Sequence, residues 1–116
     1  MKTDINNRDD LLNFLKKFYD KAQADEIIGD KFAGLNMDTH IEIIADFWAS
    51  MIHGTNNYNG DPFVKHIPMK LTNADFDRWL MLFETTIGEE YQGSKVEEMK
   101  SRAKSIATVF RYKLVK

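Results

Sequence analysis

Apolar residues recur at steps of three and four along most of this chain, which is the spacing of side chains on one face of an α-helix. Four long segments carry such a stripe, at residues 7–22, 36–51, 72–92 and 94–114. The stretch 25–32 between the first two is short and contains Gly29, so it predicts a single turn or irregular structure. The pattern therefore predicts an all-α fold.

Capping residues indicate where these helices begin. A side-chain oxygen at the cap accepts a backbone N–H of the first helical turn. An acidic residue three positions later can return the bond and complete a capping box. The predicted caps are Asn7, Asn36 or Asp38, Thr72 with Asp75, and Ser94 with Glu97.

A much shorter helix is predicted between the second and third long ones. The loop GTNNYNG at residues 54–60 is too rich in Gly and Asn for regular structure. Asp61 can cap a helix whose first position is Pro62, and Pro68 forbids its continuation beyond His66. A histidine held on so short an element suits an axial metal ligand. A histidine at this position can also stabilise the dipole at the end of the helix. Spacing alone favours that second role.

Other polar side chains border the predicted buried faces. His40 lies on the edge of the stripe formed by Ile44, Phe47 and Met51, and Tyr19 and Trp79 border the stripes of their own helices. Each of them can be a functional group directed inward or a core or rim residue whose polar tip is satisfied. His53, at a helix end, is expected to interact with the helix dipole.

Composition narrows the class of protein. The 116 residues are enough for one domain, which we expect to span 1–116. A net charge of -2 gives no reason to expect nucleic-acid binding. We also expect no membrane segment, since a span needs roughly 18 consecutive apolar residues. The polar start MKTDINNRDD is unlike a signal peptide, so we expect a cytoplasmic location.

Cysteine and aromatic content add two constraints. The absence of cysteine excludes disulfides, thiolate catalysis and cysteine-ligated metals. Eight Phe, four Tyr and two Trp are many rings for a small helical chain. They are compatible with a crowded core or with a core shaped around a flat apolar guest.

Read together, several segments resemble the group III truncated haemoglobins. The similarity extends over essentially the whole chain, and the Tyr-x-Gly-x-Pro loop that leads into Lys-His, followed by Phe-x-Arg-Trp-Leu, is its most specific part. The matching stretches are FYDKAQAD at 18–25, HIEIIADFWASM at 40–51, YNGDPFVKHI at 58–67, FDRWLMLFETT at 76–86 and RAKSIATVF at 102–110.

This resemblance implies a truncated globin fold, a two-on-two helical sandwich around haem b (iron protoporphyrin IX) with a very short proximal helix. His66 is then the proximal ligand of the haem iron, and Tyr19, His40 and Trp79 are the polar residues of the distal side. Arg78 is a candidate partner of a haem propionate. The residues implied to pack around the haem are Phe32, Ile44, Phe47 and Trp48, together with Phe63, Ile67 and Phe76.

Three functions remain open from the sequence. The first is reversible binding of O₂, NO, CO or another small ligand by ferrous haem, as in oxygen transport. The second is an enzyme on the same scaffold, a haem-dependent NO dioxygenase or a peroxidase-like enzyme, for which an external reductase supplies electrons. The third is a haem-free helical interaction module with a crowded aromatic core, which predicts a colourless protein.

Overall fold

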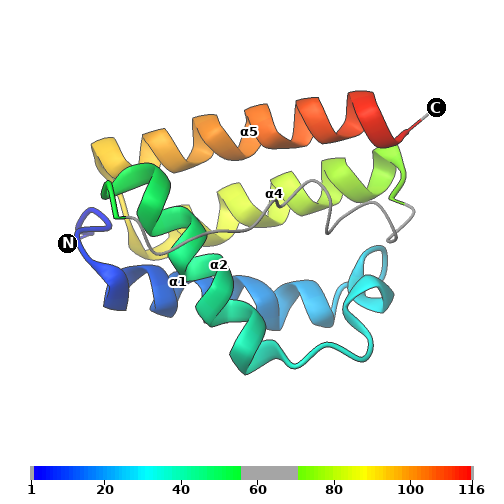
Figure 1. Ribbon diagram of the computed structural model, residues 1–116, viewed down its shortest axis with the longest axis horizontal. Coiled ribbons are helices and arrows are strands. Elements are labelled where there is room, and N and C mark those ends of the chain that lie inside the picture. Colours follow the sequence, from blue (N-terminus) through cyan, green and yellow to red (C-terminus); the bar gives the residue numbers. More distant parts are fainter. Residues whose placement is uncertain (1, 56–70, 116) are drawn as a thin grey trace.

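The computed structural model describes residues 2–55 and 71–115, and the chain is helical over most of these ranges (Figure 1). The predicted all-α fold is therefore confirmed. The short helix predicted at 61–66 lies outside the described residues. The described elements are α1 (Arg8–Gln23), the 3₁₀ helix η1 (Gly29–Phe32), α2 (Met37–Ile52), α4 (Asn73–Glu90) and α5 (Ser94–Leu114).

The long helices form two pairs. Helix α1 packs against α2, α4 packs against α5, and contacts between α1 and α4 join the pairs. Figure 1 shows α4 and α5 side by side in opposite directions, with α2 crossing the other helices. This is the two-on-two arrangement expected from the sequence. None of the helices described within residues 2–55 and 71–115 is long and apolar enough to cross a membrane.

Three of the predicted helix starts are confirmed by capping hydrogen bonds. The side chains of Asn7 and Asn36 each accept the backbone N–H three residues later, at 2.9 and 3.2 Å. Thr72 and Asp75 form a complete capping box, in which the Thr72 hydroxyl accepts the Asp75 N–H at 3.2 Å and the Asp75 carboxylate accepts the Thr72 N–H at 2.9 Å. All of these bonds are local, which is why the sequence revealed them.

The start of α5 differs from the prediction. Ser94 is its first helical residue, and the cap position belongs to Gly93, which supplies no side chain. The Asp4 carboxylate takes over the capping role from far away in sequence, accepting the backbone N–H groups of Lys95 at 2.9 Å and Val96 at 3.0 Å. Gly93 permits this approach, because its φ is 143° and a Cβ there would lie 2.5 Å from Asp4 Cγ.

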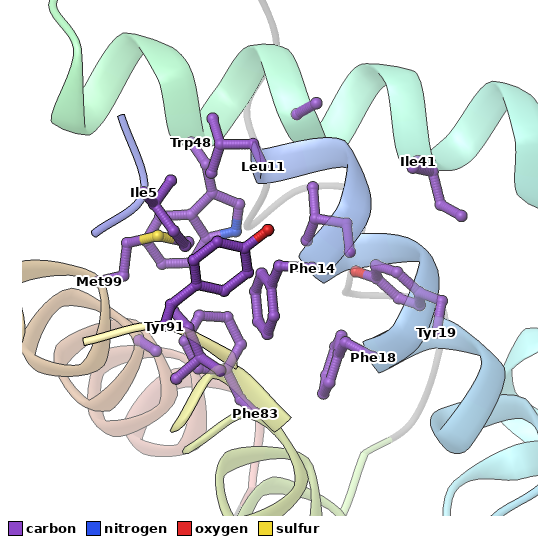
Figure 2. Packing of buried hydrophobic residues seen from close by; sticks show 14 of the residues in the cluster. Ile5, Leu11, Phe14, Phe18, Tyr19, Ile41, Trp48, Phe83, Tyr91 and Met99 are labelled. Carbon is purple, nitrogen blue, oxygen red and sulfur yellow. The ribbon is translucent and has the colours of Figure 1, made fainter. Parts of the chain in front are cut away.

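The core lies where the four long helices meet, and Figure 2 shows its aromatic centre. The Phe83 ring of α4 meets Phe14 of α1 edge to face, with ring centroids 5.0 Å apart, and meets Phe18 in the same way at 5.6 Å. Helical spacing predicted Leu11, Leu15, Phe18 and Ala22 as the apolar stripe of α1 and left out Phe14, which shares the face of Leu11 and Phe18 and is 1% exposed. The core is therefore close-packed at this end of the bundle.

Candidate functional site

The opposite end of the helix pairs encloses a cavity of about 380 Å³. Such a volume falls among small-molecule sites, which span roughly 300–1,000 Å³. Leu35 and Ile43 border it and are 46% and 38% exposed, so they mark its open side, the mouth. The described lining residues are Tyr19, Ile28, Lys31, Phe32, Leu35, His40, Ile43, Ile44, Phe47, Trp48, Leu71, Asp75, Phe76, Trp79, Ile106, Ala107 and Phe110.

Tyr19, His40 and Trp79 reach this cavity from three different helices. The Tyr19 and His40 rings meet edge to face with centroids 5.1 Å apart. Phe18 links Tyr19 with Trp79, because its ring centroid lies 4.9 Å from that of Tyr19 and 6.1 Å from that of Trp79. The fold thus brings together the three polar residues that the sequence placed on separate segments.

Tyr19 is the most buried of the three, with 6% of its surface exposed. Burial raises the pKa of its hydroxyl far above the ordinary value, because a phenolate would lose its hydration there. The hydroxyl therefore stays protonated at physiological pH and can donate a hydrogen bond.

The apolar residues of helix α2 lie partly in the packed core and partly in the cavity lining. Ile41 and Ala45 are buried in the packed core, whereas Ile44 and Phe47 are half-buried and line the cavity. Trp48 belongs to both regions, since it is 2% exposed and also borders the cavity. Apolar residues on this one helix therefore lie in two different environments.

The predicted cofactor contacts can be compared with this lining. Five of them border the cavity, namely Phe32, Ile44, Phe47, Trp48 and Phe76. The predicted iron ligand and two further predicted contacts, His66, Phe63 and Ile67, lie outside the described residues.

Part of the lining was not anticipated from the sequence. Ile106 and Phe110 were assigned to the core stripe of α5, yet both border the cavity, and Ala107 between them is buried there. Lys31 and Asp75 were not singled out as cavity residues at all. Helical spacing identifies an apolar face but does not say whether side chains or an empty space lie opposite it.

Arg78, the predicted partner of a propionate, forms an ion pair with Asp25. Its Nε donates to the Asp25 carboxylate at 2.7 Å, and that side chain is only 3% exposed. Burial acts to raise the pKa of Asp25, but hydrogen bonds from Arg78 and from the backbone N–H groups of Ile27 and Ile28 outweigh it, so the pKa is lowered. The pair ties the segment after α1 to α4. Arg78 is not among the described lining residues, and its predicted contact with a propionate stays a prediction.

The lining fits a haem in its chemistry. Haem presents broad apolar faces, and aromatic and aliphatic side chains form most of the walls. The described lining also includes a few polar side chains, those of Tyr19, His40 and Trp79 together with Lys31 and Asp75. A cavity of this composition would be costly to leave in contact with water, which favours an apolar guest.

Comparisons with known proteins define the class to which this architecture belongs. The sequence profile of the bacterial-like globins matches residues 5–111, so the chain belongs to that family. Membership of the globin family implies a haem cofactor.

Closer relatives narrow the class. The chain is 29% identical to a group 3 truncated haemoglobin of Campylobacter jejuni, an alignment that covers 100% of this chain and 97% of the relative. The crystal structure of a group III truncated haemoglobin from Campylobacter jejuni superposes with a TM-score of 0.90 at 29% identity, covering 100% of this chain and 97% of that one. The resemblance to group III truncated haemoglobins and the truncated globin fold predicted from it are thus confirmed.

Proposed function

We propose that this protein holds haem b in the cavity, with His66 as the protein ligand to the iron, and binds a diatomic gas such as O₂, NO or CO. The globin family supports the cofactor. The chain geometry supports the ligand, because His66 precedes the lining residue Leu71 by five positions and five residues span at most about 18 Å.

The observation that carries this proposal is the convergence of Tyr19, His40 and Trp79 on one cavity whose lining is mostly apolar. When bound, haem supplies an iron with an open axial position for a small ligand. The polar side chains then decide how firmly the ligand is held. In a cavity that excludes water, a directed donor has little competition from solvent.

Tyr19 is the most buried donor of the set. Its raised pKa keeps the proton on the hydroxyl, and its contacts with Phe18 and His40 fix the direction of the ring. A hydrogen bond to a partly charged ligand contributes about 1.5–3 kcal/mol. A loss of that size corresponds to roughly a 10–100-fold faster release of the ligand.

The test is the rate of O₂ release from the ferrous haem protein, measured by flash photolysis combined with stopped flow. We expect Tyr19→Phe and Trp79→Phe to accelerate release, with the larger effect in Tyr19→Phe. Tyr91→Phe is the matched control, because the Tyr91 hydroxyl accepts from Asn13 Nδ2 at 2.8 Å and does not border the cavity. If both cavity variants release O₂ within a factor of about two of the wild-type rate, the assignment of these donors is wrong.

A further inference from the structure

Lys31 is the one lysine or arginine that borders the cavity among residues 2–55 and 71–115. It belongs to η1, directly before Phe32, whose ring forms part of the same wall. Its side chain is 24% exposed, so most of it is covered, as is usual for a long side chain whose charged end reaches toward water. A cation in this position serves a guest that has both apolar and anionic parts.

The present partner of Lys31 is only loosely attached to it. The ammonium group lies 4.0 Å from Oδ2 of Asp75, at the outer limit of an ion pair. That same oxygen already accepts the Thr72 backbone N–H at 2.9 Å in the capping box of α4. Asp75 is therefore held by the helix start whether or not Lys31 stays, and Lys31 is able to take a second anion at little cost.

The position of Lys31 also agrees with where charges on a guest would lie. Burying a carboxylate without a partner is costly, so the anionic edge of a guest faces the mouth while its apolar part fills the interior. Lys31 and the exposed Leu35 come from neighbouring positions in the chain, and both border the cavity. Because its side chain is partly exposed, Lys31 is able to meet a carboxylate that faces the mouth.

We propose that Lys31 binds a propionate carboxylate of the haem at the mouth, exchanging its loose contact with Asp75 for the cofactor. It acts as a positioning residue that sets how the haem is seated. This inference rests on the proposed function and replaces Arg78, whose guanidinium is already paired with the nearly buried Asp25 carboxylate at 2.7 Å.

The experiment compares haem with its dimethyl ester, in which both propionates are uncharged. The measured quantity is the rate at which each cofactor passes from the reconstituted protein to an excess of apomyoglobin. We expect Lys31→Met to lose haem about 3–10-fold faster than wild type, as for removal of a half-exposed charge-assisted contact. The dimethyl ester should leave Lys31→Met and wild type at equal rates, which a purely structural role of Lys31 would not produce.

Three further variants make the result specific. Lys16→Met removes an exposed positive charge of α1 that is not part of the described cavity lining, and it should leave both rates unchanged. Asp75→Asn can still accept the Thr72 N–H, and by releasing Lys31 from its competitor it should slow the loss of haem. If Arg78→Met changes the rate of cofactor loss, the change should be the same for haem and for the ester.

The inference is overturned if Lys31→Met changes the two rates equally or not at all, or if the difference between haem and ester follows Arg78 instead. Those outcomes leave the proposed function intact, since the wild type still binds haem. A wild-type chain that binds neither cofactor defeats the proposed function itself. The two failures are therefore distinguishable.

Discussion

The two ends of this helical bundle are built from the same kinds of side chains, yet they are packed differently. At one end, Phe14, Phe18 and Phe83 are no more than 1% exposed and fill the space between the helices. At the other end, Phe32 and Trp79 are only half-buried, because a cavity of about 380 Å³ lies beside them. The first end is a close-packed core, and the second leaves part of its apolar surface uncovered.

This contrast shows what an aromatic-rich helical sequence can encode. Burial of apolar surface stabilises the folded chain at both ends, but only the packed end gains the full set of contacts without a ligand. The surface that the cavity end leaves uncovered is available to stabilise a bound cofactor. The boundary between core and cavity runs across every long helix, since α1, α2, α4 and α5 each contribute residues to both ends.

The largest expected effect comes from a matched pair of alanines on α5. Ala103 is fully buried in the packed core, and Ala107, one turn later, borders the cavity. We expect Ala103→Phe to lower the free energy of unfolding by about 1–3 kcal/mol, because the core has no room for the ring. In Ala107→Phe the ring enters the cavity, so the haem-free chain should keep its stability while haem binding is lost.

Urea unfolding of the haem-free chain and titration with haem measure the two quantities for each variant. Similar destabilisation by both substitutions would mean that the cavity end is as tightly packed as the core. Unimpaired haem binding by Ala107→Phe would mean that the cofactor occupies another place.

A smaller effect is expected at the packed end, where Asp4 caps α5 from outside. Burial acts to raise the pKa of Asp4, but hydrogen bonds from the backbone N–H groups of Lys95, Ile5 and Val96 outweigh it, and the pKa is lowered. The contribution to stability is therefore present above the unfolded pKa of about 3.9 and is lost as the pH falls through the lower pKa of the folded state.

We accordingly expect Asp4→Ala to lower the free energy of unfolding by about 1 kcal/mol at neutral pH. The difference from wild type should shrink as the solution is acidified below about pH 4. Denaturant titrations at several pH values check this, with Asp20→Ala, an exposed carboxylate of α1, as the control for charge. A difference that stays constant across the acid range would argue against a charged cap.

The comparison also explains how far the sequence could predict this molecule. Local relations were predictable, such as the Asn7 cap and the capping box of Thr72 with Asp75, because their partners lie three residues apart. The all-α fold followed from the spacing of apolar residues. Asp4 was not predictable as the cap of α5, since it acts across about ninety positions of sequence.

For the site, the sequence singled out several residues that border the cavity, but it did not give their arrangement. Tyr19, His40 and Trp79 were identified as polar groups at the edge of apolar faces, and the resemblance to truncated haemoglobins joined them into one set. Their meeting in a single cavity is a property of the folded chain. Lys31, the positively charged residue of the described lining, was missed because a lysine in a short turn looks like an ordinary surface residue.

The central claim is that the cavity holds haem through His66, and the visible absorption spectrum tests it most directly. Purified chain titrated with haem should develop a saturable Soret band with one haem per chain. His66→Gly should change that band, and added imidazole, which can enter the space left by the side chain and coordinate the iron, should restore the wild-type spectrum. A His66→Gly spectrum identical to that of the wild type without imidazole would contradict the account.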